Sequence, residues 1–107
     1  MTGIVSVYAT FADAGEAERV ARTLVEERLA ACANILGPCR SIYRWQGAVE
    51  EADEVAALFK TSAEMAPQLI ARLGALHSYD VPAAVAWPVA HALPEYCDWV
   101  RAEVGAQ

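Results

Sequence analysis

The chain has little positive charge. Its 107 residues contain 8 lysines and arginines against 14 aspartates and glutamates, which gives a formal net charge of −6. Nucleic acids and anionic membrane surfaces are bound by clustered basic side chains, and so we expect neither as a partner. No glycine-rich phosphate loop occurs, so nucleotide binding through a standard motif is unsupported.

Cysteine is also scarce. The three cysteines, Cys32, Cys39 and Cys97, form no Cys-x-x-Cys pair, and their odd number favours free thiols in a reducing compartment. The apolar run at residues 3–12 is too short to cross a bilayer and lacks the basic flank of a signal peptide. We therefore expect a soluble, cytoplasmic protein.

The hydrophobic periodicity predicts the element order strand, helix, strand, strand, helix, strand, helix. The expected elements are a strand at 4–11, a helix capped by Asp13 and Glu16, a strand at 29–36 broken or bulged at Gly37-Pro38, a hairpin at 40–61, a helix capped by Thr61 and Glu64, a strand at 81–89 and a helix from Pro94. The prolines near the ends of the strand at 81–89 suit an edge position or a bulge. This order is typical of an α+β, ferredoxin-like βαββαβ sandwich with an added C-terminal helix. We expect a single domain over residues 1–107.

The hairpin at residues 40–61, folded about Gly47, is the most informative segment. Ser41, Tyr43 and Trp45 share one face of its first arm, and apolar residues occur on both faces of its second arm. An arm of roughly 13 residues reaches about 40 Å, whereas a compact chain of about 100 residues has a radius of gyration near 13 Å. The hairpin should therefore project from its domain, and a second copy of the chain is its expected cover.

Several blocks of this sequence resemble the CutA family of divalent-cation tolerance proteins. The blocks are residues 27–34, 41–47, 60–61 and 76–82, followed by Tyr96 and Trp99 as a closing Tyr-x-x-Trp. Ordered blocks at family-like spacing are more specific than any single motif. The resemblance implies a ferredoxin-like subunit in a homotrimer made by long strands pairing across subunits. It also implies a shape like that of the trimeric PII signalling proteins, and a relation to copper tolerance and copper binding.

The resemblance also supplies candidate site residues. Family members with a proposed copper site use a cysteine near the end of the first strand and two adjacent histidines before the tyrosine. Here those positions hold Ala9 and the pair Leu76-His77, so one of three ligands is retained. The candidate metal ligands are His77 and Cys32, the thiol being suited to Cu(I). The candidate residues of an intersubunit cleft or interface are Tyr43, Trp45, Lys60 and Tyr79.

Each candidate also has a structural interpretation. His77 can bond carbonyl groups or stack at a helix end, Cys32 can be a small buried hydrophobe, and the hairpin aromatics can pack an interface. The acidic run of Glu50, Glu51, Asp53 and Glu54 is typical of a solvated hairpin tip.

No acid, base and nucleophile set can be assembled, so we expect no enzyme. The favoured function is weak or conditional binding of copper or another divalent cation. The alternatives are a PII-like module that binds a small metabolite in the intersubunit cleft, and an inert structural protein. The sequence identifies no hetero-partner.

Overall fold

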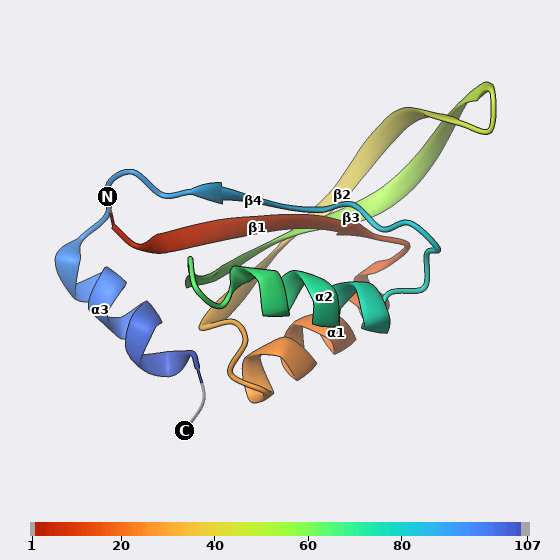
Figure 1. Ribbon diagram of the computed structural model, residues 1–107. Coiled ribbons are helices and arrows are strands. Elements are labelled where there is room, and N and C mark those ends of the chain that lie inside the picture. Colours follow the sequence, from red (N-terminus) through yellow and green to blue (C-terminus); the bar gives the residue numbers. More distant parts are fainter. Residues whose placement is uncertain (1, 106–107) are drawn as a thin grey trace.

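The computed structural model describes residues 2–105 as a four-stranded antiparallel sheet with helices against one face (Figure 1). The sheet order is β2-β3-β1-β4, which is the ferredoxin-like arrangement expected from the sequence. The elements are β1 (Ile4–Phe11), α1 (Ala14–Glu26), β2 (Cys32–Trp45), β3 (Ala48–Ser62), α2 (Ala66–Leu76), β4 (Ala84–Pro88) and α3 (Pro94–Glu103).

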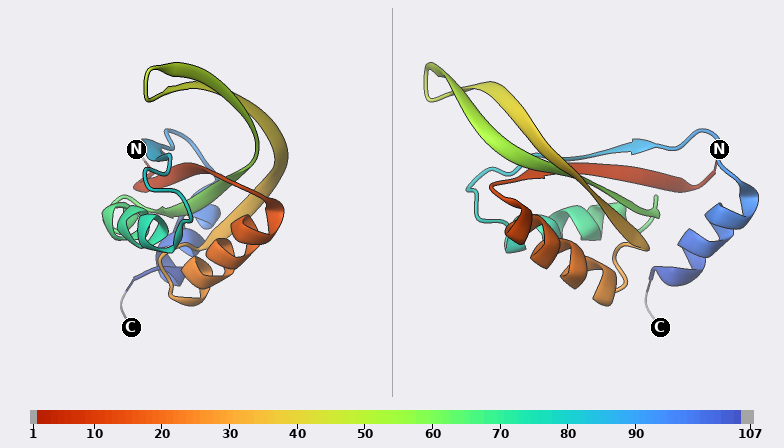
Figure 2. Two further views of the ribbon diagram at one scale, coloured as in Figure 1. Left: turned by 90° about the vertical axis from the view of Figure 1, so that its right-hand side faces the viewer. Right: turned by 180° about the vertical axis from the view of Figure 1, so that it is seen from behind.

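The main core lies between the sheet and helices α1 and α2, which cover the same face (Figure 2). Side chains alternate across a strand, so every second residue of β1 enters this core. The buried members from the strands are Val5, Val7, Ala9, Phe11, Ala57 and Phe59. A smaller cluster, which includes Ile4 and Val100, packs α3 against the end of the sheet away from the hairpin tip. Much of the second sheet face is left without a helix.

The two predicted helix caps have different outcomes. Asp13 caps α1 as expected, because its Oδ1 accepts a 2.8 Å hydrogen bond from the Glu16 N–H. The expected cap of α2 by Thr61 is wrong. Thr61 is fully buried, and its hydroxyl donates a 2.7 Å hydrogen bond to the Leu29 carbonyl oxygen. The Ser62 hydroxyl accepts from the Met65 N–H instead.

The strand boundaries differ from the sequence prediction at two places. β2 begins at Cys32 rather than at residue 29, because the backbone N–H groups of Leu29 and Ala30 both donate to the Leu24 carbonyl oxygen near the end of α1 instead of to a neighbouring strand. β4 is shorter than expected, although its position at the sheet edge is confirmed. The predicted break at Gly37 is also confirmed: the β2–β3 register shifts between Ile35 and Gly37, where the backbone φ of 106° favours glycine.

The hairpin of β2 and β3 extends well beyond the helices (Figure 1). Its pairing runs from Cys32 opposite Lys60 out to Trp45 opposite Ala48, and the longest dimension of the molecule is 44 Å. Near its tip, large apolar side chains meet solvent in the single chain: Ile42 is 68% exposed and Val49 is 63% exposed. The predicted projection is thus present. Within residues 2–105, none of the helices has both the length and the apolar character that crossing a bilayer requires.

Candidate binding site beneath the hairpin

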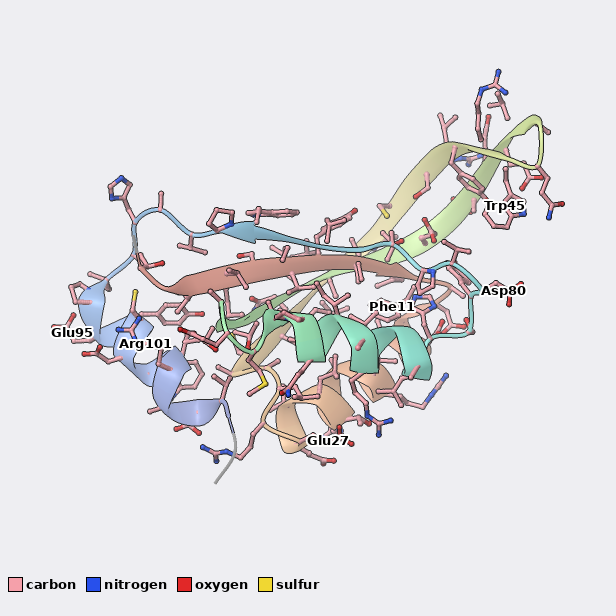
Figure 3. The ribbon with its side chains drawn as sticks, in the orientation of Figure 1. Phe11, Glu27, Trp45, Asp80, Glu95 and Arg101 are labelled. Atoms are coloured by element: carbon pink, nitrogen blue, oxygen red, sulfur yellow. The ribbon has the colours of Figure 1, made fainter. Side chains whose placement is uncertain are left out.

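A groove of about 660 Å³ lies between the hairpin, the end of β1 and the loop that joins α2 to β4. It opens on the sheet face opposite α1 and α2. Figure 3 labels Trp45 on the hairpin and Asp80 on the loop, which approach the groove from two sides. The lining residues are Tyr8, Thr10, Ser41, Tyr43, Arg44, Trp45, Glu50, Glu54, Tyr79, Asp80, Val81 and Ala83.

Strand alternation explains why distant residues share this groove. Val7 and Ala9 of β1 point into the helix-covered core, so Tyr8 and Thr10 between them face the other way. On the hairpin, Tyr43 of β2 lies opposite Glu50 of β3, and both line the groove. The groove therefore follows from the register of the sheet.

Glu54 is the most buried carboxylate of the groove, with 9% of its surface exposed. The Ser41 hydroxyl donates a 2.5 Å hydrogen bond to its Oε1, and the Tyr79 hydroxyl donates a 2.8 Å hydrogen bond to its Oε2. Burial, followed by this hydrogen bond and the charge of Glu54, raises the pKa of Tyr79. Within residues 2–105, no lysine, arginine or histidine forms an ion pair with Glu54.

The expectation that Glu54 belongs to a solvated tip is therefore wrong. Glu54 lies at the base of the hairpin, where the strand enters the body of the sheet and neighbouring elements cover it. Its neighbours Glu51 and Asp53 are exposed, as expected, and lie 2.6 Å and 3.7 Å from the Arg40 guanidinium. The sequence did carry a signal for this difference. Residues two or four apart on a strand share a face, so Glu54 is expected on the face of Glu50 and opposite Glu51 and Asp53.

His77 follows the end of α2, and its side chain is fully buried. The Tyr79 N–H donates a 3.1 Å hydrogen bond to Nδ1, so the hydrogen-bond network assigns the ring proton to Nε2. Nε2 then donates a 2.7 Å hydrogen bond to the Thr10 carbonyl oxygen, and the ring stacks on Phe11 at a centroid distance of 4.8 Å. This agrees with the structural interpretation of His77. A metal ion could reach either nitrogen only by displacing one of these partners.

Glu16 is a second buried carboxylate close to His77 and was not singled out from the sequence as a site residue. Its oxygens accept hydrogen bonds from the Ser78 N–H at 2.7 Å, the Ser78 hydroxyl at 3.0 Å and the Ala12 N–H at 3.3 Å. Burial alone raises the pKa of Glu16, but these hydrogen bonds outweigh it, so its pKa is lowered overall. The carboxylate thus fixes the start of the loop that carries Tyr79.

Cys32 lies at a different place. Thr10, which bonds His77, lies opposite Ala56 of β3. Cys32 lies opposite Lys60, four residues further along the same strand. Four residues of strand span about 13 Å, so Cys32 and Lys60 are well separated from His77. The Cys32 thiol lies 3.5 Å from the Tyr96 hydroxyl. Burial, followed by that hydrogen bond, raises the pKa of Tyr96 to about 12.

The sequence candidates therefore divide into two groups. The structure brings Tyr43, Trp45 and Tyr79 together in the groove, whereas His77, Cys32 and Lys60 do not line it. Among residues 2–105, no three side chains of histidine, cysteine, aspartate or glutamate are placed to hold a metal ion. The prediction that His77 and Cys32 bind metal stays a prediction.

Fold and groove together define a ferredoxin-like α+β chain with a long projecting hairpin above an aromatic and acidic groove. The sequence profile of the CutA1 divalent ion tolerance proteins matches residues 5–103. The chain belongs to this family.

Individual relatives are similar over nearly the whole chain. A divalent-cation tolerance protein of Thermus thermophilus is 51% identical over 89 residues, which is 83% of this chain and 86% of the relative. The crystal structure of CutA from Xylella fastidiosa has a TM-score of 0.93 and 42% identity, and covers 96% of this chain and 99% of that one. A structure from Archaeoglobus fulgidus has a TM-score of 0.91 and 37% identity, with coverage of 95% and 99%.

The Archaeoglobus fulgidus protein is described as a periplasmic divalent cation tolerance protein. This finding contradicts the cytoplasmic location expected from the sequence, and that expectation is withdrawn. The prediction failed because it was based on free thiols and a short apolar run, which are properties of the chain itself. Neither feature specifies a compartment.

Proposed function

We propose that the protein acts as a homotrimer of the divalent-cation tolerance type, in which each hairpin packs on a neighbouring subunit. The observation that carries this proposal is the hairpin itself. Trp45 is 42% exposed in the single chain, and the outer edge of β2 has no partner strand within residues 2–105. A long apolar hairpin with an open edge is a liability in water unless another chain covers it. Curated relatives carry the divalent-cation tolerance name.

Light scattering on a size-exclusion peak tests the assembly. We expect three times the 11.5 kDa mass of one chain across a dilution series. A stable monomer would contradict the proposal because it would leave the hairpin uncovered, and a stable dimer would contradict the expected number of subunits.

We further propose that the trimer binds copper or another divalent cation weakly or conditionally, without catalysing a reaction. The support is chemical: both His77 nitrogens have protein partners, and Cys32 lies apart from His77. A dedicated site needs several ligands converging on one point. Calorimetry with Cu(II), Zn(II) and Mg(II) tests this proposal, and we expect micromolar or weaker binding. Nanomolar affinity for any of these ions would overturn it.

A second candidate function is the binding of a small metabolite in the groove, in the manner of a PII-like regulatory module. The observation that favours it is the combination of four aromatic side chains with hydrogen-bonding groups around about 660 Å³ of space. Pockets of this size that combine apolar walls with a few polar groups commonly bind small molecules. Metabolite-induced changes in tryptophan fluorescence without a response to metal ions would favour this candidate over the first.

A further inference from the structure

We propose that residues 77–83, which we call the strap, couple the position of the hairpin to the start of α1. The strap joins α2 to β4 and belongs to neither a helix nor a strand. In Figure 1 it runs from the end of α2, in the helix layer, to the sheet edge that carries β4. The contacts that hold it lie within one chain, so the coupling does not depend on the number of subunits.

The helix end of the strap is held by Glu16, in the first turn of α1. Its Oε2 accepts a 2.7 Å hydrogen bond from the Ser78 N–H, and its Oε1 accepts a 3.0 Å hydrogen bond from the Ser78 hydroxyl. Glu16 is buried, and a buried carboxylate is costly when its hydrogen-bond donors are removed. Detachment of Ser78 would take two donors from Glu16, so the docked position of the strap is favoured.

The middle of the strap is held by His77, whose ring contacts the Thr10 carbonyl oxygen and Phe11. The Tyr79 N–H donates a 3.1 Å hydrogen bond to Nδ1 of this ring. The N–H groups of Ser78 and Tyr79 therefore both donate to side chains rather than to backbone carbonyl groups. A segment held in this way can detach locally without the opening of a helix or a strand.

The hairpin end of the strap is the Tyr79 hydroxyl, which donates a 2.8 Å hydrogen bond to Oε2 of Glu54 in β3. Oε1 of the same carboxylate accepts a 2.5 Å hydrogen bond from the Ser41 hydroxyl in β2, so Glu54 connects Tyr79 to both strands of the hairpin. The Cα atoms of the consecutive residues Ser78 and Tyr79 are about 3.8 Å apart, and a displacement of about 1 Å is enough to break such a hydrogen bond. Loss of the Glu16 contacts should therefore loosen the base of the hairpin.

Assembly keeps these anchors inside the subunit. In the single chain the side chains of His77 and Glu16 are 0% and 8% exposed, and Glu54 is 9% exposed. A neighbouring subunit can only increase this burial, and none of the contacts requires free space beside the hairpin. Glu16 belongs to the helix layer on one face of the sheet, whereas the hairpin is the segment that we propose to pack on a neighbour. The strap thus allows a change in the helix layer to alter that packing.

The experiment is amide hydrogen exchange of the assembled protein, followed by NMR. Glu16→Ala removes the helix end of the coupling, and we expect about fivefold faster exchange at the base of the hairpin, residues 39–43 and 52–56, as the loss of one buried hydrogen bond allows. Glu16→Gln keeps an oxygen acceptor and should have a smaller effect. Glu18→Ala is the matched control, since Glu18 is an exposed residue of α1 that forms no ion pair within residues 2–105.

The reverse experiment removes the hairpin end of the coupling. Tyr79→Phe should speed exchange of the Ser78 amide, which is bonded to Glu16, by about fivefold, because coupling between two sites acts in both directions. Tyr8→Phe is the control, since the Tyr8 hydroxyl forms no side-chain hydrogen bond within residues 2–105. If Glu16→Ala fails to assemble, Ser78→Ala replaces it. It removes one hydrogen bond to Glu16, leaves α1 unchanged, and should speed exchange at the base of the hairpin in the same direction but less.

Faster exchange at the end opposite each substitution, by more than any change at the core residues Val7 and Leu24, would support the coupling. The coupling would be overturned if each substitution speeds exchange only at its own end of the strap. It would also be overturned if exchange at Val7 and Leu24 rises as much as at the hairpin base, because that pattern indicates a general loss of stability. Light scattering measures the number of subunits separately, so failure of the coupling would leave the proposed assembly intact.

Discussion

The Tyr79 hydroxyl donates a 2.8 Å hydrogen bond to Oε2 of Glu54, and this contact connects the loop after α2 to the base of the hairpin. The backbone N–H of the same Tyr79 donates to Nδ1 of His77, whose ring stacks on Phe11 in the helix-covered core. Tyr79 therefore joins the two faces of the sheet. The hairpin aromatics line a groove in which the position of Tyr79 is fixed by its contact with the buried core.

The first prediction concerns this contact. Tyr79→Phe removes one hydrogen bond to a carboxylate and should lower the free energy of unfolding by about 1–2 kcal/mol. The measurement is urea unfolding at a fixed protein concentration, since assembly makes stability depend on concentration. Tyr8→Phe is the control, because the Tyr8 hydroxyl forms no side-chain hydrogen bond within residues 2–105 while its ring lines the same groove. Equal losses in the two variants would show that the Tyr79 contact contributes nothing specific.

The second prediction concerns Trp45 as an anchor between subunits. Truncating a central interface aromatic typically costs about 2 kcal/mol or more of association free energy. We expect Trp45→Ala to dissociate at higher concentration than the parent while its far-UV spectrum is largely unchanged, because Trp45 lies outside the subunit core. Trp45→Phe, which keeps an aromatic ring, should assemble nearly as well. Sedimentation over a dilution series measures the difference. Unchanged assembly of Trp45→Ala would exclude an anchoring role.

The sequence predicted the fold well because its signals are local and strong. The β-rich run Ile4–Phe11, the Asp13 cap and the Gly37-Pro38 break each act within a few residues, and the structure contains all three. The Thr61 cap failed for a tertiary reason: a carbonyl group on a distant segment, at Leu29, takes its hydroxyl. A local sequence pattern contains no information about a distant carbonyl group that binds the capping hydroxyl.

The candidate site was predictable only in part for the same reason. The aromatic residues Tyr43 and Trp45 were visible from their shared strand face. The role of Glu54 was not, because its burial depends on Tyr79, 25 residues further along the chain. The sequence placed Glu54 in an acidic run. Strand alternation puts it on the face opposite Glu51 and Asp53, but alternation alone does not show which face is covered.

The third prediction is the effect of pH through Glu16. Its carboxyl pKa is lowered from 4.5 in the folded state, so the hydrogen bonds from Ser78 and Ala12 stabilise the fold above that pH. The stabilisation should be lost as the pH falls below 4.5 and through the lowered folded pKa. Glu16→Gln should show a smaller loss of stability between neutral and acidic pH than the parent. Thermal unfolding at a series of pH values measures it. A parallel pH profile for the two proteins would contradict the assignment.

The fourth prediction concerns copper at His77. Because Nδ1 accepts from Tyr79 and Nε2 donates to Thr10, a Cu(II) ion must replace one of these partners, and we expect micromolar or weaker affinity. Affinity should fall further as the pH decreases, since protons compete for the imidazole nitrogens. If copper does use Nδ1, the Tyr79 amide loses its hydrogen bond and nitrogen coupling appears in the Cu(II) EPR spectrum.

His77→Gln and His91→Gln test which histidine is responsible. His91 is exposed, so its substitution should leave the fold unchanged and alter copper binding little. His77→Gln keeps a donor and an acceptor on the side chain, which limits the loss of the Thr10 and Tyr79 contacts, and it should clearly reduce copper binding. Calorimetry and EPR on both variants decide between them. If copper binds equally well to His77→Gln, the ion sits elsewhere and the ligand assignment carried by the family resemblance fails for this chain.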